Sequence, residues 1–306
     1  MSFLTAHPTD DVLIAGIAQK GLWSSTDGGT TWTALGSGSG SAAITNRTSS
    51  IVFDPTTPST YWESGIYNNN GVYKTTNAGS VFSALGDAHH CDSIAVDFSD
   101  ASRQTLMAGG HETAQSLFRS TNAGSTWTNV GMNMSAGDKK CNTPLIIDGM
   151  THVVGCWDYD GSGGISRTTN GGTTWSRVYD KGISYGGPLN LGSVLYYPRS
   201  NDAGLVRSSD GGKTWIEVGA GGDVSSLNPV ALPGGRIGTW GPRGMMVSSD
   251  SGDHWTVATP ASPWRPNGIA YSMARKTFYL WHFSCGNGNI PVPDDAIIGI
   301  AYDPGP

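Results

Sequence analysis

The sequence predicts an all-β fold that is built from repeated units. Three observations indicate it: a short motif that recurs six times, apolar runs of strand length around each copy, and no sustained helical periodicity. The chain has 306 residues, of which 44 are glycine and only 14% are charged. Self-similarity at a period of roughly 20–50 residues is typical of repeat architectures.

Each copy of the motif has eight residues and begins with Ser or Thr. Asp or Asn stands third, Gly fifth and Trp or Phe eighth, and the copies occupy residues 25–32, 75–82, 120–127, 168–175, 208–215 and 248–255. The third position falls at residues 27, 77, 122, 170, 210 and 250, so the spacings are 50, 45, 48, 40 and 40. At about 45 residues per unit, the chain holds about seven units, six with the motif and one without.

The eight residues fit a tight turn between two strands, which we call the repeated turn. Asp or Asn can accept hydrogen bonds from backbone N–H groups two residues on. The Gly supplies a backbone conformation with positive φ, and the Ser or Thr hydroxyl can bond within the same loop. The aromatic residue starts the next strand and is large enough to wedge between neighbouring sheets. A calcium loop is disfavoured, because each copy offers one carboxylate or amide and no terminal Glu.

Strand-like runs precede the repeated turns at residues 21–23, 71–73 and 204–206, and follow them at 32–35 and 215–218. Residues 3–6 read as an innermost strand. The last segment supplies runs at 267–273, 277–283 and 297–302 without a repeated turn or an obvious fourth strand. We therefore expect either a last unit of three strands or a closing strand removed with an upstream segment.

The six copies resemble the Asp-box, or BNR, repeat, Ser/Thr-x-Asp/Asn-x-Gly-x-x-Trp/Phe. This repeat occurs in sialidases, xyloglucan-active glycoside hydrolases, sortilin-type receptor ectodomains and photosystem assembly factors. The resemblance covers residues 1 to about 260 and implies one domain over residues 1–306, a seven-bladed β-propeller of four-stranded antiparallel blades. In these families the box lies between the third and fourth strands of a blade, away from the ligand face. The motif thus indicates a structural role for these residues and does not mark a ligand-binding site.

Composition narrows the function and the compartment. The net charge is −6 with 18 Lys and Arg and no basic stripe, so we expect no nucleic-acid partner. No run of 18 apolar residues occurs, so no membrane span is expected, and no signal peptide is recognisable. The low Lys content and the extracellular habit of most Asp-box relatives favour a secreted protein. We expect no cofactor.

The four cysteines are few for a disulfide scaffold. Cys141 should begin the inner strand of the fourth blade, and Cys156 should end the strand hairpinned to it, which favours a disulfide between them. A Cys141–Cys91 bridge and free thiols throughout are the alternatives, and Cys285 has no assigned partner.

Functional residues should lie on the face opposite the repeated turns, in the loops between blades and between the second and third strands. These loops also hold Glu63, Tyr67, Tyr185 and Asp223. Aromatic rings beside carboxylates and Arg are typical of sugar-binding clefts, whereas an ordinary solvated loop surface is the alternative. We assign catalysis to Asp92, Asp158, Asp160 and His89. We assign substrate binding to Arg47, His90, His111, Glu112, Trp157, Tyr159, Trp240, Arg243, Trp264, Arg265, Trp281 and His282.

Three chemistries fit these loops to different degrees. Glycoside hydrolysis needs two flanking carboxyl groups, but no spacing rule selects a pair from Asp92, Asp158, Asp160 and Asp223. The Arg-Ile-Pro pattern of sialidases is missing, and xyloglucan hydrolases join two propellers whereas this chain has residues for one. Elimination at a uronic acid would use His89, His90, His111 or Tyr159 as base and Arg265 against the carboxylate. Adjacent residues of a strand point to opposite faces, so His89, His90, Cys91 and Asp92 do not predict a metal site.

The sequence therefore predicts a secreted, carbohydrate-directed propeller that binds a polysaccharide at its channel face. A stronger version of this prediction is that the protein also cleaves the polysaccharide as a glycoside hydrolase. A non-enzymatic module for a protein partner, like sortilin-type receptors or photosystem assembly factors, is the first alternative. A uronate-specific polysaccharide lyase is the second. Because the ligand-face loops differ from blade to blade, one central site is favoured over repeated lectin-like sites.

Overall fold

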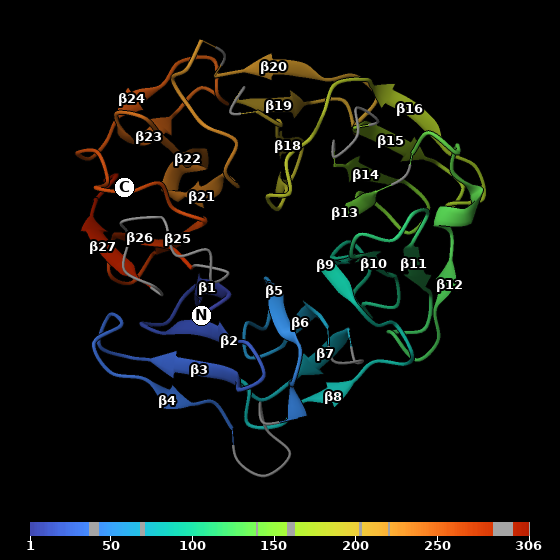
Figure 1. The fold of residues 1–306 in the computed structure, drawn as a ribbon, viewed down its shortest axis with the longest axis horizontal. Coiled ribbons are helices and arrows are strands. Elements are labelled where there is room, and N and C mark those ends of the chain that lie inside the picture. Colours follow the sequence, from blue (N-terminus) through green and yellow to red (C-terminus); the bar gives the residue numbers. More distant parts are fainter. Residues whose placement is uncertain are drawn as a thin grey trace.

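The protein is a seven-bladed β-propeller in the computed structural model, with blades arranged around a central axis (Figure 1). The structure describes residues 1–36, 43–67, 71–138, 140–157, 163–201, 204–219, 221–283 and 296–305. Successive strands of each blade are antiparallel neighbours, and the blades follow the chain in order. The predicted fold class is confirmed.

The strands of the first four blades are bounded as follows. Blade 1 has β1 (Phe3–Ala6), β2 (Leu13–Ile17), β3 (Gly21–Ser25) and β4 (Thr33–Ala34). Blade 2 has β5 (Arg47–Phe53), β6 (Tyr61–Ile66), β7 (Val72–Thr75) and β8 (Ser83–Ala84). Blade 3 has β9 (Cys91–Val96), β10 (Leu106–Gly110), β11 (Leu117–Ser120) and β12 (Thr128–Asn129). Blade 4 has β13 (Cys141–Ile146), β14 (His152–Cys156), β15 (Gly164–Thr168) and β16 (Ser176–Tyr179).

The remaining blades complete the ring. Blade 5 has β17 (Leu189–Leu191), β18 (Val194–Pro198), β19 (Leu205–Ser208) and β20 (Ile216–Val218). Blade 6 has β21 (Val230–Leu232), β22 (Arg236–Gly241), β23 (Gly244–Ser248) and β24 (Thr256–Val257). Blade 7 has β25 (Gly268–Ser272), β26 (Thr277–Trp281) and β27 (Ile297–Ala301). The short 3₁₀ turns η2 (Gly131–Asn133) and η3 (Pro233–Gly235) follow β12 and β21.

The ring closes where β1 packs beside β25, the blue and red blades of Figure 1. Within the described part of the chain, blade 7 has three strands, and no strand is shared between the first and last blades. Arg275 of blade 7 reaches blade 1, with Nε 2.5 Å and Nη2 2.8 Å from the two carboxylate oxygens of Asp11. The same guanidinium donates to the Thr26 carbonyl at 2.9 Å. Among the described residues, side-chain contacts therefore join the three-stranded blade 7 to blade 1.

The core lies between the blades. The buried apolar residues form seven clusters, and each cluster joins one pair of neighbouring blades. Successive side chains of a strand point to opposite faces, so Val153 of β14 packs toward blade 5 while Val154 packs toward blade 3. Each sheet is therefore buried on both faces, which explains why the middle strands read as continuous apolar runs instead of alternating ones.

The repeated turns connect the third and fourth strands of blades 1 to 6. In the first, the Ser25 hydroxyl donates to Asp27 Oδ1 at 2.8 Å and accepts the Gly29 N–H at 2.8 Å. Asp27 accepts the N–H groups of Thr30 and Thr31, at 3.0 and 2.9 Å. The carboxylate thus serves N–H groups three and four residues on, not two as expected, because the Ser hydroxyl takes the nearer one.

Glycine at the fifth position of the repeated turn adopts the expected positive φ in every copy, between 75° and 96°. The aromatic residue at the eighth position fixes the turn in two ways. The indole N–H groups of Trp32, Trp215 and Trp255 donate to carbonyls of their own turns. Those of Trp127 and Trp175 donate to carbonyls of the preceding blade, Leu85 at 2.9 Å and Val130 at 3.2 Å. The aromatic residues therefore lie between sheets, as predicted.

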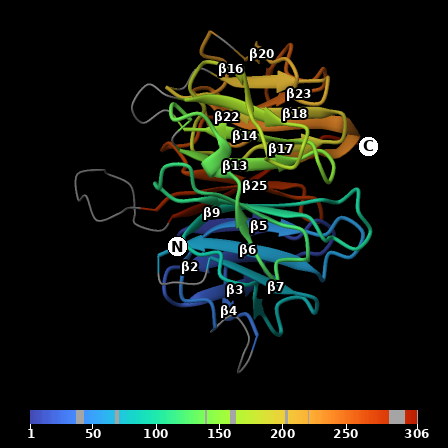
Figure 2. The ribbon, with the colours of Figure 1, turned by 90° about the vertical axis from the view of Figure 1, so that its right-hand side faces the viewer.

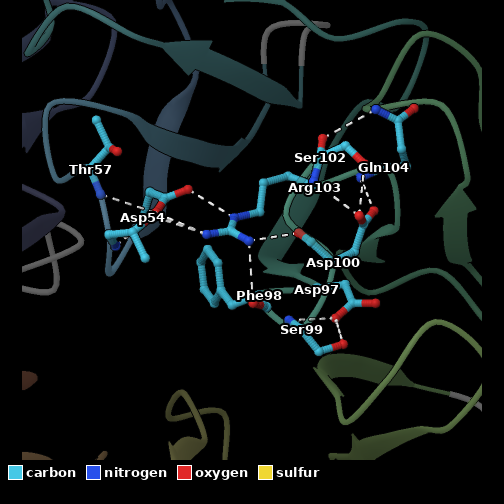
Figure 3. A network of polar contacts seen from close by, with 10 residues as sticks. Asp54, Thr57, Asp97, Phe98, Ser99, Asp100, Ser102, Arg103 and Gln104 are labelled. Carbon is cyan, nitrogen blue, oxygen red and sulfur yellow. Dashed lines mark hydrogen bonds and ion pairs between the residues drawn. The ribbon is translucent and has the colours of Figure 1, made fainter.

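Arginines also join neighbouring blades. Arg103 of blade 3 forms a bidentate ion pair with Asp54 of blade 2, with Nε and Nη2 at 2.9 and 3.2 Å from the carboxylate oxygens (Figure 3). Farther along, Arg167 and Arg207 each donate at 2.8 Å to a backbone carbonyl of the next blade's repeated turn, those of Gly211 and Ser251. The contacts of Arg167 and Arg207 thus hold the repeated turns in the scaffold, whereas the Arg103–Asp54 pair joins two turns between first and second strands.

We predict that Gly212→Ala destabilises the protein more than Gly211→Ala does. Both glycines have positive φ, 75° and 71°, so each substitution strains the backbone by about 1 kcal/mol. A Cβ on residue 212 would lie 2.5 Å from Val153 Cγ1, whereas a Cβ on residue 211 meets nothing within 4 Å. The clash should add about 1–3 kcal/mol. Urea unfolding of the two variants measures the difference, and equal stabilities would contradict the packing described.

Glu63 is a buried acid in the sheet of blade 2. It was expected on a ligand-face loop, but it lies within β6, fully buried, with Oε2 accepting from Asn46 Nδ2 at 3.2 Å. Burial raises the pKa of Glu63 to about 8, and hydrogen bonds from Thr48 and Asn46 only partly oppose this. Glu63 is therefore a protonated component of the interior at neutral pH.

We predict that Glu63→Gln removes a pH-dependent loss of stability. Between the ordinary pKa of 4.5 and about 8, the unfolded chain is ionised at this residue while the folded protein keeps the proton. The stabilising contribution is complete below 4.5 and is lost as pH rises through 8, by at most about 1.4 kcal/mol per pH unit. Urea unfolding across this range should show Glu63→Gln gaining on the wild type as pH rises.

The matched control is Glu217→Gln. Its carboxylate pairs with Lys181, which lowers the pKa of Glu217, so the stabilising contribution is complete above the ordinary pKa of 4.5 and is lost only as pH falls below it. Between pH 4.5 and 8 this variant should therefore stay below the wild type by a constant amount. Parallel stability curves for Glu63→Gln and the wild type would show that Glu63 is ionised in the folded protein.

Candidate functional site

The two faces of the ring carry different kinds of loop. The repeated turns share a face with the turns between first and second strands, since Ala78 and Ala123 donate backbone hydrogen bonds to Ser59 and Gln104 of those turns. The inter-blade loops and the loops between second and third strands lie at the other end of the strands. Figure 2 views the ring from the side and places the N-terminus and the end of the chain toward opposite faces.

On the face opposite the repeated turns, side chains from blades 2 to 5 meet in one group, which we call the His111 cluster. Its members come from four blades, and they are Tyr67, His90, Asp92, His111, Asn142, Trp157 and Tyr185.

A buried carboxylate lies at the centre of this cluster. Asp92 Oδ1 accepts from His111 Nδ1 at 2.8 Å and from the Tyr185 hydroxyl, and Oδ2 accepts from Asn142 Nδ2 at 2.7 Å. Asp92 and His111 are each 5% exposed. Because a carboxylate only accepts hydrogen bonds, it fixes the His111 proton on Nδ1 and leaves Nε2 as an acceptor. The Tyr67 hydroxyl lies 3.3 Å from that Nε2 and is placed to donate to it.

Aromatic rings extend outward from His111. The ring centroids of Tyr67 and Tyr185 lie 5.4 and 6.1 Å from that of His111, both edge-to-face, and Trp157 lies 5.2 Å beyond Tyr185. Tyr67 is 47% exposed and Tyr185 is 37% exposed, while Trp157 is half-buried. The Lys140 ammonium lies 5.7 Å from the Trp157 ring centroid. The cluster therefore presents flat rings to solvent above a buried polar network.

The backbone around the cluster is strained. Tyr67, His90 and Glu112 have φ values of 62°, 56° and 52°, which residues other than Gly adopt rarely and at a cost. This conformation lets the Tyr67 N–H donate to His90 Nδ1 at 3.0 Å, so the His90 proton lies on Nε2. Burial, together with neighbouring His111, lowers the pKa of His90, which is thus neutral at pH 7.

A disulfide supports the blade 4 side of the cluster. Cys141 and Cys156 are bonded and begin and end the paired strands β13 and β14, as the sequence analysis favoured. Asn142 and Trp157 directly follow these two cysteines in the chain. Cys91 is a buried free thiol, and burial raises its pKa.

The cluster brings together some of the predicted site residues. Asp92, His90, His111 and Trp157 belong to it, and exposed Glu112 lies at its edge with Oε1 3.7 Å from His111 Nε2. His89 is exposed and bonds the Asp87 carbonyl of its own loop. Asp158, Tyr159 and Asp160 lie outside the described residues.

Other predicted residues lie elsewhere on the ring. Arg243 is exposed and pairs with Asp223 at 2.7 Å, and Arg265 is exposed. Arg47 lies with Cζ 4.9 Å from the Phe283 ring centroid. Half-buried Trp240 and Trp264 pack against the core between blades 6 and 7, and the Trp264 ring lies 5.8 Å from that of buried His282.

The expected loop position of Trp281 is wrong, as is that of Glu63. Trp281 was assigned to a ligand-face loop, but it is the last residue of β26 and is 7% exposed. Its ring packs against Phe3 and Phe283 in the core between blades 7 and 1. Trp281 lies within the strand-like run at 277–283, and its side chain faces the neighbouring blade, so it closes the core.

Sequence reasoning gave no role to three members of the cluster. Tyr67 and Tyr185 were noted only as loop residues, and Asn142 had no signal beyond following Cys141. In the described part of the chain, no three His, Cys, Asp or Glu side chains are placed to share a metal ion. No helix among these residues is long and apolar enough to cross a membrane.

Comparisons with known proteins agree with the fold. No protein-family model matches the chain. Over 133 residues it is 32% identical to a xyloglucanase of Paenibacillus sp., a match that covers 38% of this chain and 13% of the xyloglucanase. The chain therefore spans a small part of that relative.

Two solved structures illustrate the likeness of fold. An ancestral GH74 enzyme superposes with a TM-score of 0.55 at 17% identity, over 97% of this chain and 46% of the enzyme. YCF48 bound to D1 peptide superposes with a TM-score of 0.53 at 12% identity, over 91% of this chain and 82% of YCF48. The neighbours thus include carbohydrate-active enzymes and a peptide-binding propeller that share the architecture.

Proposed function

We propose that the protein is a secreted carbohydrate-binding propeller that holds a glycan on the His111 cluster. The observation that carries this proposal is the row of rings formed by Tyr67, Tyr185 and Trp157 above the buried Asp92–His111 pair. Apolar rings with a few fixed polar groups are typical of small-molecule sites. Sugars present flat C–H faces and hydroxyls, which match rings and polar groups respectively.

The comparisons and the chemistry of the chain support the proposal. We identify the repeated turns as Asp boxes and residues 1–306 as one domain, similar in architecture to part of a GH74 enzyme. The Cys141–Cys156 disulfide fits an oxidising compartment, because such bonds are rare in the cytosol. Secretion and a polysaccharide ligand are consistent with the partial match to a xyloglucanase.

We assign binding, not hydrolysis, to the described cluster. A glycosidase needs two carboxyl groups that flank the scissile bond. Both oxygens of Asp92 accept hydrogen bonds from side chains of the cluster, so this carboxylate is neither an available nucleophile nor an available acid. Glu112 is the remaining carboxylate at the edge of the described cluster, and one carboxylate does not suffice.

Peptide binding is the second candidate. YCF48 is described in complex with a D1 peptide, and this chain covers 82% of YCF48 but 46% of the ancestral GH74 enzyme. A propeller of this size with exposed Tyr67 and Tyr185 is also suited to a protein segment.

We predict that Trp157→Ala weakens glycan binding by roughly tenfold or more, a loss of about 1.4 kcal/mol. Calorimetric titration with oligosaccharides chosen from a glycan array measures this affinity. Trp23→Ala is the matched control, because Trp23 is a half-buried indole on β3 of blade 1, bonded to the Lys20 carbonyl. Unchanged affinity in Trp157→Ala would remove the cluster from the site, and failure to bind any glycan would favour the peptide candidate.

A further inference from the structure

Three groups of the His111 cluster form a continuous line of hydrogen bonds from the interior to the surface. Buried Asp92 accepts from His111 Nδ1 at 2.8 Å, and the Tyr67 hydroxyl lies 3.3 Å from His111 Nε2. A hydroxyl that donates to an imidazole held by a carboxylate is the general arrangement for activating an oxygen. The exposed end of this line is a phenol oxygen, which serves as an acid or base.

The positions of these groups are set at a cost to the backbone. Tyr67, His90 and Glu112 all adopt left-handed φ values, and they come from three separate loops of two blades. Such strained conformations persist where the surrounding contacts hold them in place, and they are common at functional sites. Simple ring stacking would not require this arrangement, whereas placing one hydroxyl against one ring nitrogen would.

The available chemistry is proton transfer. The described cluster lacks a pair of free carboxylates, so it does not fit the two-carboxylate hydrolysis mechanisms. A phenol oxygen backed by an imidazole can remove a proton from carbon only where that proton is acidic. Among common sugars this condition is met at C5 of a uronic acid, next to the carboxylate.

We propose that Tyr67 is the catalytic residue of a β-elimination that cleaves uronate polysaccharides, with His111 and Asp92 as its positioning residues; this rests on the proposed glycan binding. Tyr67 passes its hydroxyl proton to His111 Nε2 and removes the C5 proton of the sugar. The C5–H electron pair forms the C4–C5 double bond, and the bond from C4 to the glycosidic oxygen breaks. The leaving oxygen takes the proton from Tyr67, which recovers its own from His111, so protons and electrons balance without a co-reactant.

Two further groups suit a uronate ligand. His90 is neutral with its proton on Nε2, and it lies beside Tyr67 with ring centroids 5.1 Å apart, so it offers a donor to the sugar carboxylate. Lys140 at the other end of the cluster attracts a polyanion. The charged and titratable groups that face His111 are Asp92, Glu112, His90, Tyr67 and Tyr185.

Because Tyr67 removes the C5 proton as a base and then protonates the leaving oxygen as an acid, both transfers take place on the same side of the sugar ring. The C5 proton and the leaving oxygen must then lie on the same side, as in mannuronate and glucuronate. In galacturonate and guluronate they lie on opposite sides. The structure therefore leads to a specific substrate class, polymers of mannuronate or glucuronate.

The test incubates the protein with polymannuronate, glucuronan, polygalacturonate and neutral xyloglucan. The ultraviolet absorbance of unsaturated uronate reports elimination, reducing ends report any cleavage, and calorimetry reports binding. We expect unsaturated product from polymannuronate or glucuronan only. Tyr67→Phe should lower kcat by about 100-fold to 10,000-fold with little change in binding. Tyr179→Phe is the matched control, because that hydroxyl bonds Glu217 on the outer strands and should leave kcat unchanged.

The role of Asp92 has its own readout. Asp92→Asn should lower kcat with little change in KM, because an amide group no longer fixes the His111 proton on Nδ1. A merely structural role would change KM and thermal stability together with kcat, and thermal melting checks that the variant folds.

The outcomes separate the two proposals. Binding of a uronate polymer without unsaturated product overturns elimination and leaves the glycan-binding proposal standing. Reducing ends without unsaturation, full turnover in Tyr67→Phe, or cleavage of polygalacturonate in place of polymannuronate and glucuronan also overturns it. Failure to bind any glycan overturns both.

Discussion

The structure depends on one constraint, which is that every sheet must bury both of its faces against other sheets. Neighbouring residues such as Val153 and Val154, or Tyr196 and Tyr197, belong to different apolar clusters on the two sides of one blade. A sheet with two apolar faces is unstable alone, and a closed ring gives every blade two neighbours. The loops on either end of the strands are then free to differ, because the burial that stabilises the fold does not involve them.

Most of the fold could be predicted because the turn that repeats is governed by local chemistry. Asp27, Gly29 and Trp32 stand close together in the chain, so their conformational needs appear in the sequence six times over. The Cys141–Cys156 bond was open to prediction for a similar reason, since the two residues face each other across one hairpin. Prediction failed where strand residues were assigned to loops, because Trp281 lies in β26 with its side chain in the core and Glu63 lies within β6.

The candidate site could be predicted only in outline. The sequence indicates that Asp92, His111 and Trp157 lie on one face. It does not indicate that both carboxylate oxygens of Asp92 accept hydrogen bonds from other side chains. The partners that occupy it come from other blades, Asn142 and Tyr185 being 50 and 93 residues away in the chain. No local pattern encodes such contacts. The left-handed backbone of Tyr67 is equally hidden, because the sequence Asn68 to Gly71 predicts a turn here but does not show that Tyr67 is a residue with positive φ.

The closure of the ring has a mechanical consequence. Between the first and last blades, no strand crosses the join within the described residues, and an ion pair of partly exposed Arg275 and Asp11 supplements the apolar contacts. Exposed ion pairs are weak and screened by salt, so the apolar contacts between β1 and β25 supply most of the stability of this seam. The His111 cluster belongs to blades 2 to 5, away from the seam (Figure 1). Changes at the seam therefore act on the closure of the ring and not directly on the contacts of the cluster.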